Sequence, residues 1–211
     1  MKVRAYDRHT DTFVDLSDKA CQFSYRASLF NTSARERYIV LQVTYALINH
    51  GTPAIRYLDV QREFERRSEP IALGEVRAAV RRIRARKAML LIEGDLDCRS
   101  AGSFFKNPFL TESQFRDLQS RAQLDIPRYP ADPGRVKTSA AWLIEHAGFT
   151  KGYSIGSAGI STKHTLAIVN KGGATAEDIL RLAREIHDRV YSEFGVRLVP
   201  EPVFVGLDGA A

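Results

Sequence analysis

Cysteine is scarce in this sequence of 211 residues, which contains only Cys21 and Cys98. The two stand far apart in the chain, and neither has partners at the spacing that metal ligands need. The pattern argues against a disulfide framework and against a zinc site, and it favours a reducing cytoplasm as the location.

Long apolar runs are also missing. No stretch approaches the roughly 18 apolar residues that a membrane-spanning helix needs, and polar and charged residues follow Met1 where a signal peptide has an apolar segment. The sequence therefore predicts neither a signal peptide nor a membrane span. The glycine-rich residues 152–159 match neither the phosphate-binding loop nor the dinucleotide fingerprint, so we assign them no nucleotide-binding role.

Acidic residues are fewer than basic ones, 25 against 31, which gives a net charge of +6 and a pI near 9.4. This mild excess suits an anionic ligand as well as a nucleic acid, so the charge does not choose between them. Arginines between residues 74 and 87 surround apolar residues at helical spacing, and we interpret them chiefly as the solvated face of a helix. A basic nucleic-acid-binding module stays open as a minor alternative.

The rest of the composition is that of a globular protein, with 44% hydrophobic residues, enough for a sizeable core. The order of the helical and strand patterns predicts an α+β fold in which helices cover one face of a sheet. The predicted strands are residues 3–6 and 12–16, which form an opening hairpin, and residues 38–49 and 165–170. The predicted helices are residues 57–67, 74–87, 111–122, 140–147 and 175–194.

Capping residues mark several of the predicted helix ends. Thr111 and Gln114 have the spacing of a capping box. Thr138 or Ser139 caps the helix that begins at residue 140, and Gly195 ends the last helix. The opening hairpin has no earlier segment to pair with, so we expect an unpaired strand edge there.

Residues 100–108, with the sequence SAGSFFKNP, are the stretch with the most chemistry. Small residues and a glycine set the Ser103 hydroxyl on backbone that can approach a ligand closely, and Asn107 places an amide four residues later. Taken alone, the pattern fits a ligand-binding site, or a turn in which Ser103 is a cap and Phe104 and Phe105 enter the core.

A resemblance to a known family favours the site. Residues 102–108 resemble the GSFFKNP signature of the UDP-N-acetylenolpyruvoylglucosamine reductases, also called UDP-N-acetylmuramate dehydrogenases. Residues 21–30 resemble the C-x-F-x-Y-R-x-S-x-F segment of the type with a tyrosine-bearing loop. Residues 137–145 resemble K-x-S-A-A-W-L-I-E, in which we expect Trp142 in the core, and residues 198–206 resemble L-E-P-E-V-R-F-I-G.

The chain also departs from the family pattern. After Lys87, which falls where the family has a phosphate-binding lysine, it reads AMLL where the family commonly has LPDP. In the last motif Glu201 matches the catalytic glutamate, but Val199 replaces the other glutamate, Pro202 a valine and Val203 an arginine. Because proline has no backbone N–H, we expect that strand to lie with Pro202 at an edge or a bulge.

The resemblance implies a flavoenzyme of peptidoglycan synthesis that uses NADPH and FAD to reduce UDP-N-acetylglucosamine enolpyruvate to UDP-N-acetylmuramate. On this resemblance Ser103 donates a proton to the carbon next to the substrate carboxylate. Glu201 holds a proton toward that carboxylate or restores the proton of Ser103, which requires a raised pKa. The remaining implied residues contact the substrate: Tyr25, Lys87, Asn107 and His164.

The resemblance covers only the later part of the family, from residue 21 to residue 206. It implies a remnant of the FAD-binding domain at residues 1–88, a substrate-binding domain at residues 89–196, and a strand at residues 197–211 that returns toward the missing first domain. The main flavin-binding loops and a catalytic arginine belong to the part not covered. A shortened gene, a decaying copy and a separately encoded N-terminal half as partner are the three origins that we consider.

The alternative function is a non-catalytic UDP-sugar-binding fragment. We expect no nucleic acid and no membrane among the partners, because a nucleic-acid binder requires none of the motifs around Tyr25, Ser103 and Glu201.

Overall fold

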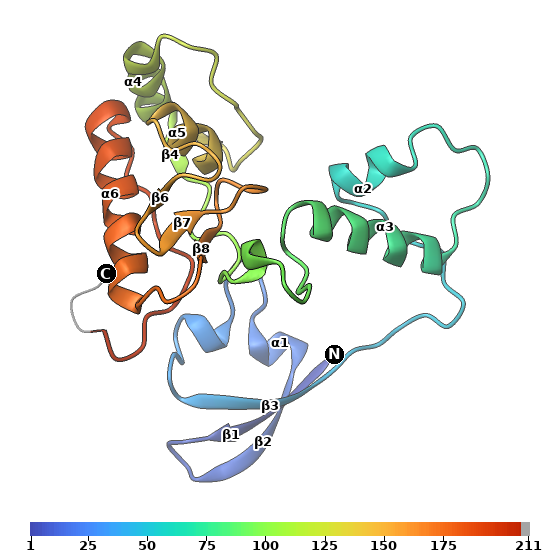
Figure 1. The fold of residues 1–211 in the computed structure, drawn as a ribbon. Helices are drawn as coiled ribbons and strands as arrows, with labels where there is room; N and C mark the ends of the chain where they lie inside the picture. The colour runs from blue at the N-terminus through green and yellow to red at the C-terminus, as the bar shows by residue number, and fades with distance from the viewer. Residues whose placement is uncertain (208–211) are drawn as a thin grey trace. The chain divides into compact units, whose positions relative to one another are not determined.

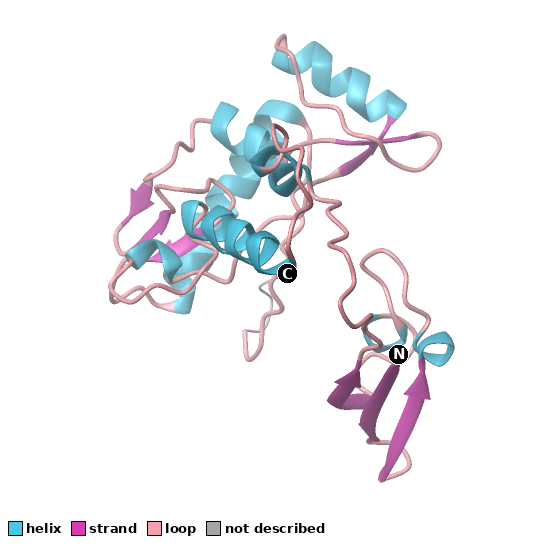
Figure 2. Ribbon diagram, turned by 90° about the vertical axis from the view of Figure 1, so that its right-hand side faces the viewer, coloured by secondary structure: helices cyan, strands magenta, loops and turns pink. Residues whose placement is uncertain are grey.

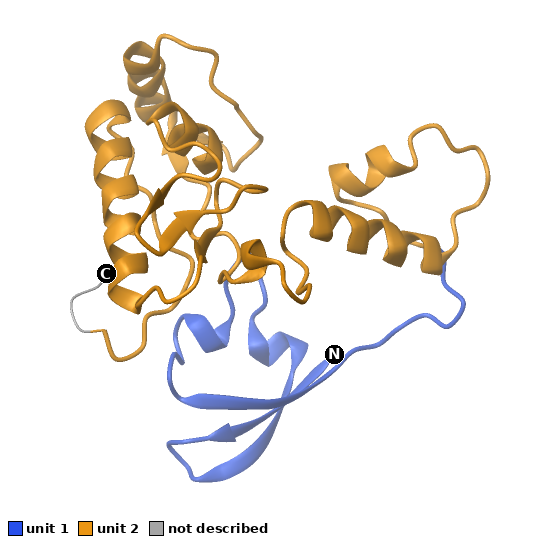
Figure 3. Ribbon diagram, viewed as in Figure 1, with its two compact units in different colours: residues 1–52 blue, residues 53–211 orange. Residues whose placement is uncertain are grey.

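The structure, a computed structural model, describes residues 1–207 of the chain, which divides into two compact units (Figure 3). Unit 1 is Met1–Thr52, and unit 2 begins at Pro53. The domain boundary expected near residue 88 stays a prediction, and the end of the segment expected at residues 197–211 lies outside the described residues. Within residues 1–207, no helix is both long enough and apolar enough to cross a membrane.

Unit 1 is built on an antiparallel sheet in the order β2-β1-β3 (Figure 1). β1 (Lys2–Asp7) and β2 (Thr12–Ser17) form the expected opening hairpin, and β3 (Tyr38–Thr44) pairs with the other side of β1. The expectation of an unpaired edge on the first strand is therefore wrong, because a later segment covers that edge. β3 ends at residue 44, short of the expected 49, because Thr44 already pairs with Lys2, the first residue of β1.

The connection between β2 and β3 contains the helical turns α1 (Asp18–Cys21) and η1 (Leu29–Asn31). Near its end, Arg37 donates hydrogen bonds to both carboxylate oxygens of Asp7, with a shortest N–O distance of 2.6 Å. The Arg37 guanidinium is the main reason that the pKa of the buried Asp7 carboxyl falls to about 2. This ion pair ties the connection to the central strand.

Unit 2 begins with α2 (Leu58–Glu63) and α3 (Leu73–Arg86), which confirm the two helices expected there. Glu63 of α2 accepts from two arginines of α3, Arg82 at 3.3 Å and Arg86 at 2.5 Å. These arginines therefore have carboxylate partners within the chain, which supports the interpretation of the basic residues as a solvated helix face.

The rest of unit 2 is an α+β body in which helices pack on short antiparallel sheets (Figure 2). One sheet pairs β4 with β5, and in the other β7 lies between β6 and β8. The elements in chain order are η2 (Leu96–Cys98), β4 (Phe109–Thr111), α4 (Glu112–Ala122), β5 (Arg135–Lys137), α5 (Ala140–His146), β6 (Ser154–Ile155), β7 (Ala158–Ile160), β8 (Ile168–Asn170) and α6 (Ala176–Phe194).

The core of the body is formed largely by α6 and α5. Leu182, Ile186 and Val190 are buried at helical spacing along α6, and Leu143 of α5 belongs to the same cluster. Trp142, expected in the core, is half-buried: it packs against the edge of this cluster with its ring stacked on that of His146.

Helix capping confirms the helix starts predicted from the sequence. Thr111 and Gln114 form the capping box of α4. Of the two candidates before α5, Ser139 is the cap, whereas the buried Thr138 donates instead to a loop carbonyl at 2.7 Å. Gly195 ends α6 in the left-handed region, with φ 69°.

The sequence patterns predict the short strands less well. Residues 152–159, expected to be turns, contain the hairpin of β6 and β7, and the strand expected at residues 165–170 is reduced to β8. Strands of two or three residues carry too little alternation to be recognised in a sequence.

The strand expected at residues 198–206 is reduced to one antiparallel bridge, between Phe105 and Pro200. Pro202 lies just beyond this bridge, where the missing N–H interrupts no strand pairing.

Candidate functional site

The signature at residues 100–108 passes through the core of the body. Phe104 and Phe105 are buried, with their ring centroids 5.1 Å apart in an edge-to-face arrangement. Gly102 has φ +80°, a backbone conformation that L side chains rarely adopt, so the residue before Ser103 requires glycine. Ser103 itself is half-buried. The two aromatic residues thus serve the core, as one interpretation of the motif predicted, and they hold Ser103 at its edge.

The structure brings the segment of Ser103 together with that of Glu201. The Glu201 N–H donates to the carbonyl of Phe104 at 2.8 Å, and the Lys106 N–H donates to the carbonyl of Val199 at 2.9 Å. Ser103 and Glu201 therefore lie on paired antiparallel segments, although they are far apart in the sequence. The Glu201 side chain is exposed.

A cavity of about 330 Å³ lies along these paired segments. Phe104, Phe105 and Phe204 contribute aromatic rings to its wall, and Arg184 and Arg197 contribute positive charge. FAD needs a long cleft with a turn that holds its diphosphate. Since the cavity is small and glycine-free, its residues do not fit FAD by themselves.

Asn107 links the signature to α5. Its side-chain oxygen accepts from the Ala140 N–H, the first of that helix, at 2.9 Å, and the Thr138 N–H donates to the Pro108 carbonyl at 3.0 Å. The amide oxygen thus serves the fold, and a ligand contact by Asn107 would come from its NH₂ group.

His164 is half-buried and experiences the charge of two lysines. Burial is the main cause that lowers the pKa of His164, and the charges of Lys87 and Lys151 lower it further against an opposing effect of Glu145. Lys87 follows α3 and pairs with Asp59 at 2.5 Å. His164, Lys87 and Lys151 form what we call the cationic corner of the body, an arrangement that suits an anionic ligand.

Sequence reasoning missed Lys151 in this corner. The residue stands between a helix and a glycine, in a stretch with no chemical pattern of its own. Only its electrostatic effect on His164 in the folded chain draws attention to it.

Tyr25 belongs to unit 1, at the tip of the tight turn in which Ser24 and Ala27 exchange backbone hydrogen bonds of 2.9 and 3.3 Å. The ring is 69% exposed, and the Arg26 guanidinium carbon lies 5.8 Å from its centroid. Arg26 has φ 57°, which the tight turn requires. This turn presents a phenol and a guanidinium at the surface of unit 1.

Metal ligands do not gather in the part of the chain that the structure describes, since no group of three or more His, Cys, Asp or Glu residues there is arranged to hold an ion. Both cysteines are free and buried.

The helices and the short antiparallel sheets define the fold class as α+β. Comparisons with known proteins then identify the family within this class. The model of the family described as UDP-N-acetylenolpyruvoylglucosamine reductase, C-terminal domain, matches residues 94–205. The chain therefore belongs to this reductase family, as its motifs predicted.

Individual relatives agree with the family match. The chain is 49% identical to a UDP-N-acetylenolpyruvoylglucosamine reductase of Streptomyces coelicolor, over 98% of its own length and 56% of the relative's. It is 45% identical to the enzyme of that name from Thermobifida fusca, over 98% of its own length and 60% of the relative's. A crystal structure of the reductase from Thermus caldophilus is similar, at 25% identity and a TM-score of 0.49, over 93% of this chain and 50% of that one. The chain thus spans little more than half the length of the curated relatives it matches.

Proposed function

We propose that this chain is the substrate-side part of a UDP-N-acetylmuramate dehydrogenase, an oxidoreductase of peptidoglycan synthesis. The complete enzyme reduces UDP-N-acetylglucosamine enolpyruvate to UDP-N-acetylmuramate, with FAD and NADPH as cofactors. The observation that carries the proposal is the hydrogen-bonded pairing of the segment that follows Ser103 with the segment of Glu201.

Reduction of an enol ether next to a carboxylate requires negative charge to be stabilised and a proton to be delivered to the adjacent carbon. We assign the proton to the Ser103 hydroxyl. A serine is a weak acid, but a carbanion-like carbon is a far stronger base, so the transfer is favourable. Glu201, on the paired segment, either holds a proton toward the substrate carboxylate or returns a proton to Ser103.

The substrate also carries a diphosphate, and we assign it to the cationic corner. Lys87 and Lys151 supply positive charge, and His164 at neutral pH supplies an uncharged imidazole, since its pKa is lowered. Asn107 donates from its NH₂ group. For Tyr25, the substrate contact rests on its match to the family's tyrosine-bearing loop. We assign the main FAD-binding part to the portion of the relatives that this chain does not span, because the residues of the cavity beside the signature do not fit FAD. A cytoplasmic location follows from the substrate and agrees with the free cysteines.

The proposal is tested by two titrations of the purified chain, one with UDP-N-acetylglucosamine and one with FAD. We expect saturable binding of the UDP-sugar and its loss in Lys87→Ala, and no saturable change in flavin fluorescence. Failure to bind the UDP-sugar at low salt would overturn the proposal. Binding of both ligands would correct the assignment of FAD to the portion that this chain does not span, and NADPH oxidation would then be assayed at once.

A non-catalytic UDP-sugar-binding fragment is the second candidate, and the small glycine-free cavity favours it. The two candidates differ in one result. Addition of the N-terminal part of a relative such as the Streptomyces coelicolor enzyme restores NADPH-dependent reduction of the substrate only if Ser103 and Glu201 are catalytic.

A further inference from the structure

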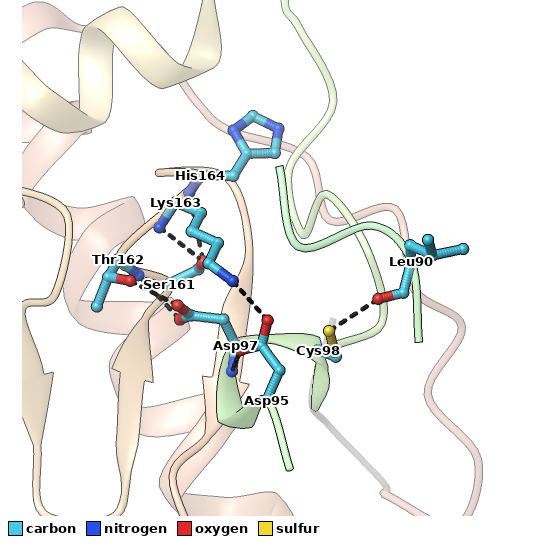
Figure 4. Close-up of polar contacts among 8 residues, drawn as sticks. All are labelled: Leu90, Asp95, Asp97, Cys98, Ser161, Thr162, Lys163 and His164. Atoms are coloured by element: carbon cyan, nitrogen blue, oxygen red, sulfur yellow. Dashed lines mark hydrogen bonds and ion pairs between the residues drawn. The ribbon is translucent and has the colours of Figure 1, made fainter. Parts of the chain in front are cut away.

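Two segments of unit 2 that are distant in sequence are joined by a set of side-chain contacts, which we call the acidic clamp (Figure 4). Asp97 accepts from both the backbone N–H and the hydroxyl of Thr162, at 2.9 and 2.5 Å. Next to it, the Lys163 ammonium donates to Asp95 at 2.5 Å. Figure 4 shows the two carboxylates of the one segment facing Thr162 and Lys163 of the other.

Each of the two segments of the clamp is also stabilised by hydrogen bonds within itself. Asp95 accepts from the Asp97 N–H at 3.0 Å, and the Cys98 thiol donates to the Leu90 carbonyl at 2.8 Å. On the facing side, the buried Ser161 hydroxyl accepts from the backbone N–H groups of Lys163 and His164, at 3.1 and 3.3 Å. The two segments therefore meet as preformed turns.

The position of the clamp connects it to the cationic corner. Asp95 follows Lys87 by eight residues, and Thr162 and Lys163 directly precede His164. Between Lys87 and the clamp, Ala88 has φ 54° and the Met89 N–H donates to the Arg84 carbonyl at 2.7 Å, which ends α3 sharply. This turn therefore fixes the direction in which the chain leaves Lys87 toward Asp95.

We propose that Asp97 is a positioning residue that locks the turn of His164 against the segment after Lys87 and so shapes the cationic corner for a diphosphate. The identity of the anion rests on the proposed function, but the locking of the turn does not. Asp97 does not touch the anion in this arrangement. It acts through Thr162, because two hydrogen bonds to one carboxylate restrict both the position and the rotation of the turn.

The test follows the pKa of His164 by proton NMR in the 211-residue chain, with the His164 signal assigned by its absence in His164→Gln. The charged groups that act on this imidazole are Lys87, Lys151 and Glu145. Removal of a negative charge at Asp97 would by itself lower the pKa of His164. Release of the turn would raise it toward the ordinary value, because burial and two lysines keep it low. The two effects have opposite signs, so the direction of the change separates them.

We expect the pKa of His164 to rise in Asp97→Ala and to stay low in Asp97→Asn, since the asparagine oxygen still accepts from the Thr162 N–H and its NH₂ group can donate to the Thr162 hydroxyl, so both contacts are kept. Asp117→Ala, which removes an exposed carboxylate from α4, is the matched control and should leave the pKa unchanged. An unchanged or lower pKa in a folded Asp97→Ala variant overturns the proposal, as does an equal rise in the control. If Asp97→Ala does not fold, the exposed Thr162 is changed instead, and Thr162→Val removes the hydroxyl that donates to Asp97. A rise in the pKa of His164 in that variant supports the proposal, and an unchanged pKa overturns it.

Inorganic pyrophosphate serves as the probe for the second part of the proposal, that the cationic corner binds a diphosphate. We expect it to shift the His164 signal saturably, with an affinity about three- to tenfold lower in Asp97→Ala than in the unchanged chain. No response to pyrophosphate, together with the pKa change in Asp97→Ala, would leave the lock in place and overturn the diphosphate assignment of the corner. Equal affinities in the two proteins would overturn the positioning role.

Discussion

The sheet of unit 1 and the α+β body of unit 2 differ in how much apolar surface they bury. In unit 1 the buried apolar side chains are Val3, Ala5 and Cys21, whereas Leu41 of β3 is 52% exposed and Ile39 51%. In the body, by contrast, one continuous cluster of buried residues joins the signature to α4, α5 and α6. The body thus carries its own hydrophobic driving force, while unit 1 relies on its backbone pairing and the Asp7–Arg37 ion pair.

This difference indicates that the two units have unequal stabilities. A three-stranded sheet that leaves apolar side chains of β3 in water lacks most of the burial that offsets the conformational entropy of ordering. The candidate catalytic and cationic groups lie on the well-packed body, and Tyr25 lies on the weaker unit.

The largest expected effect is a loss of activity. It should occur at Ser103, at the edge of the core, without a loss of stability in the core itself. In an assembly that reduces the substrate, we expect Ser103→Ala to slow substrate reduction by several orders of magnitude, because the proton donor is lost. Reduction of the flavin by NADPH and the thermal stability of the body should stay unchanged. Stopped-flow kinetics measures the two half-reactions separately, and a slowing of tenfold or less would contradict the assignment of Ser103.

The next largest effect is a loss of stability, which should differ between the core of the body and the sheet of unit 1. Leu143→Ala should lower the free energy of unfolding of the body by about 2–5 kcal/mol, because the side chain is fully buried and leaves a cavity. The matched change Leu41→Ala, at a half-exposed position of β3, should cost about 0.5 kcal/mol or less. Urea unfolding followed by circular dichroism measures both, and equal costs would show that the surface of β3 is covered in solution.

The strongest effect of low pH should fall on unit 1, because the pKa of Asp7 is lowered further than that of the carboxyl groups in unit 2, such as Asp178 of α6. The pKa of Asp7 is lowered to about 2 by Arg37, from 3.8 in an unfolded chain. A depressed pKa in the folded state means that this contribution to stability is complete above pH 4 and is lost as the pH falls toward 2. Hydrogen exchange of β1 and β3 should therefore accelerate over this range before that of α6 does. Asp7→Asn is the control, and persistence of the acceleration in that variant would rule out the ion pair as its cause.

The smallest expected effect comes from helix caps. Thr175→Ala removes the cap of α6 and should cost about 1 kcal/mol, because the long helix packs on the core and fraying is transmitted to it. Ser17→Ala removes the corresponding cap of α1, a helix of four residues, and should change stability much less. Thermal unfolding of the two variants measures the comparison, which fails if the two losses are equal.

Local signals predicted most of the helices. The box of Thr111 and Gln114 and the glycine at position 195 act within one helical turn, so they keep their meaning whatever surrounds them. The strands were harder to predict, because β6, β7 and β8 are too short for a period of two. The central place of β1 also depends on β3, which lies some thirty residues further along the chain.

The sequence by itself determined the family, the α+β class, the presence of the main helices and the candidate site residues that belong to motifs, since motifs and caps are properties of adjacent residues. Only the tertiary structure paired the segment after Ser103 with that of Glu201, brought Lys87 and Lys151 to His164, and set Asp97 against Thr162. These neighbours are separated by tens of residues, and which of them meet depends on how the core of the body packs. No local pattern contains that information.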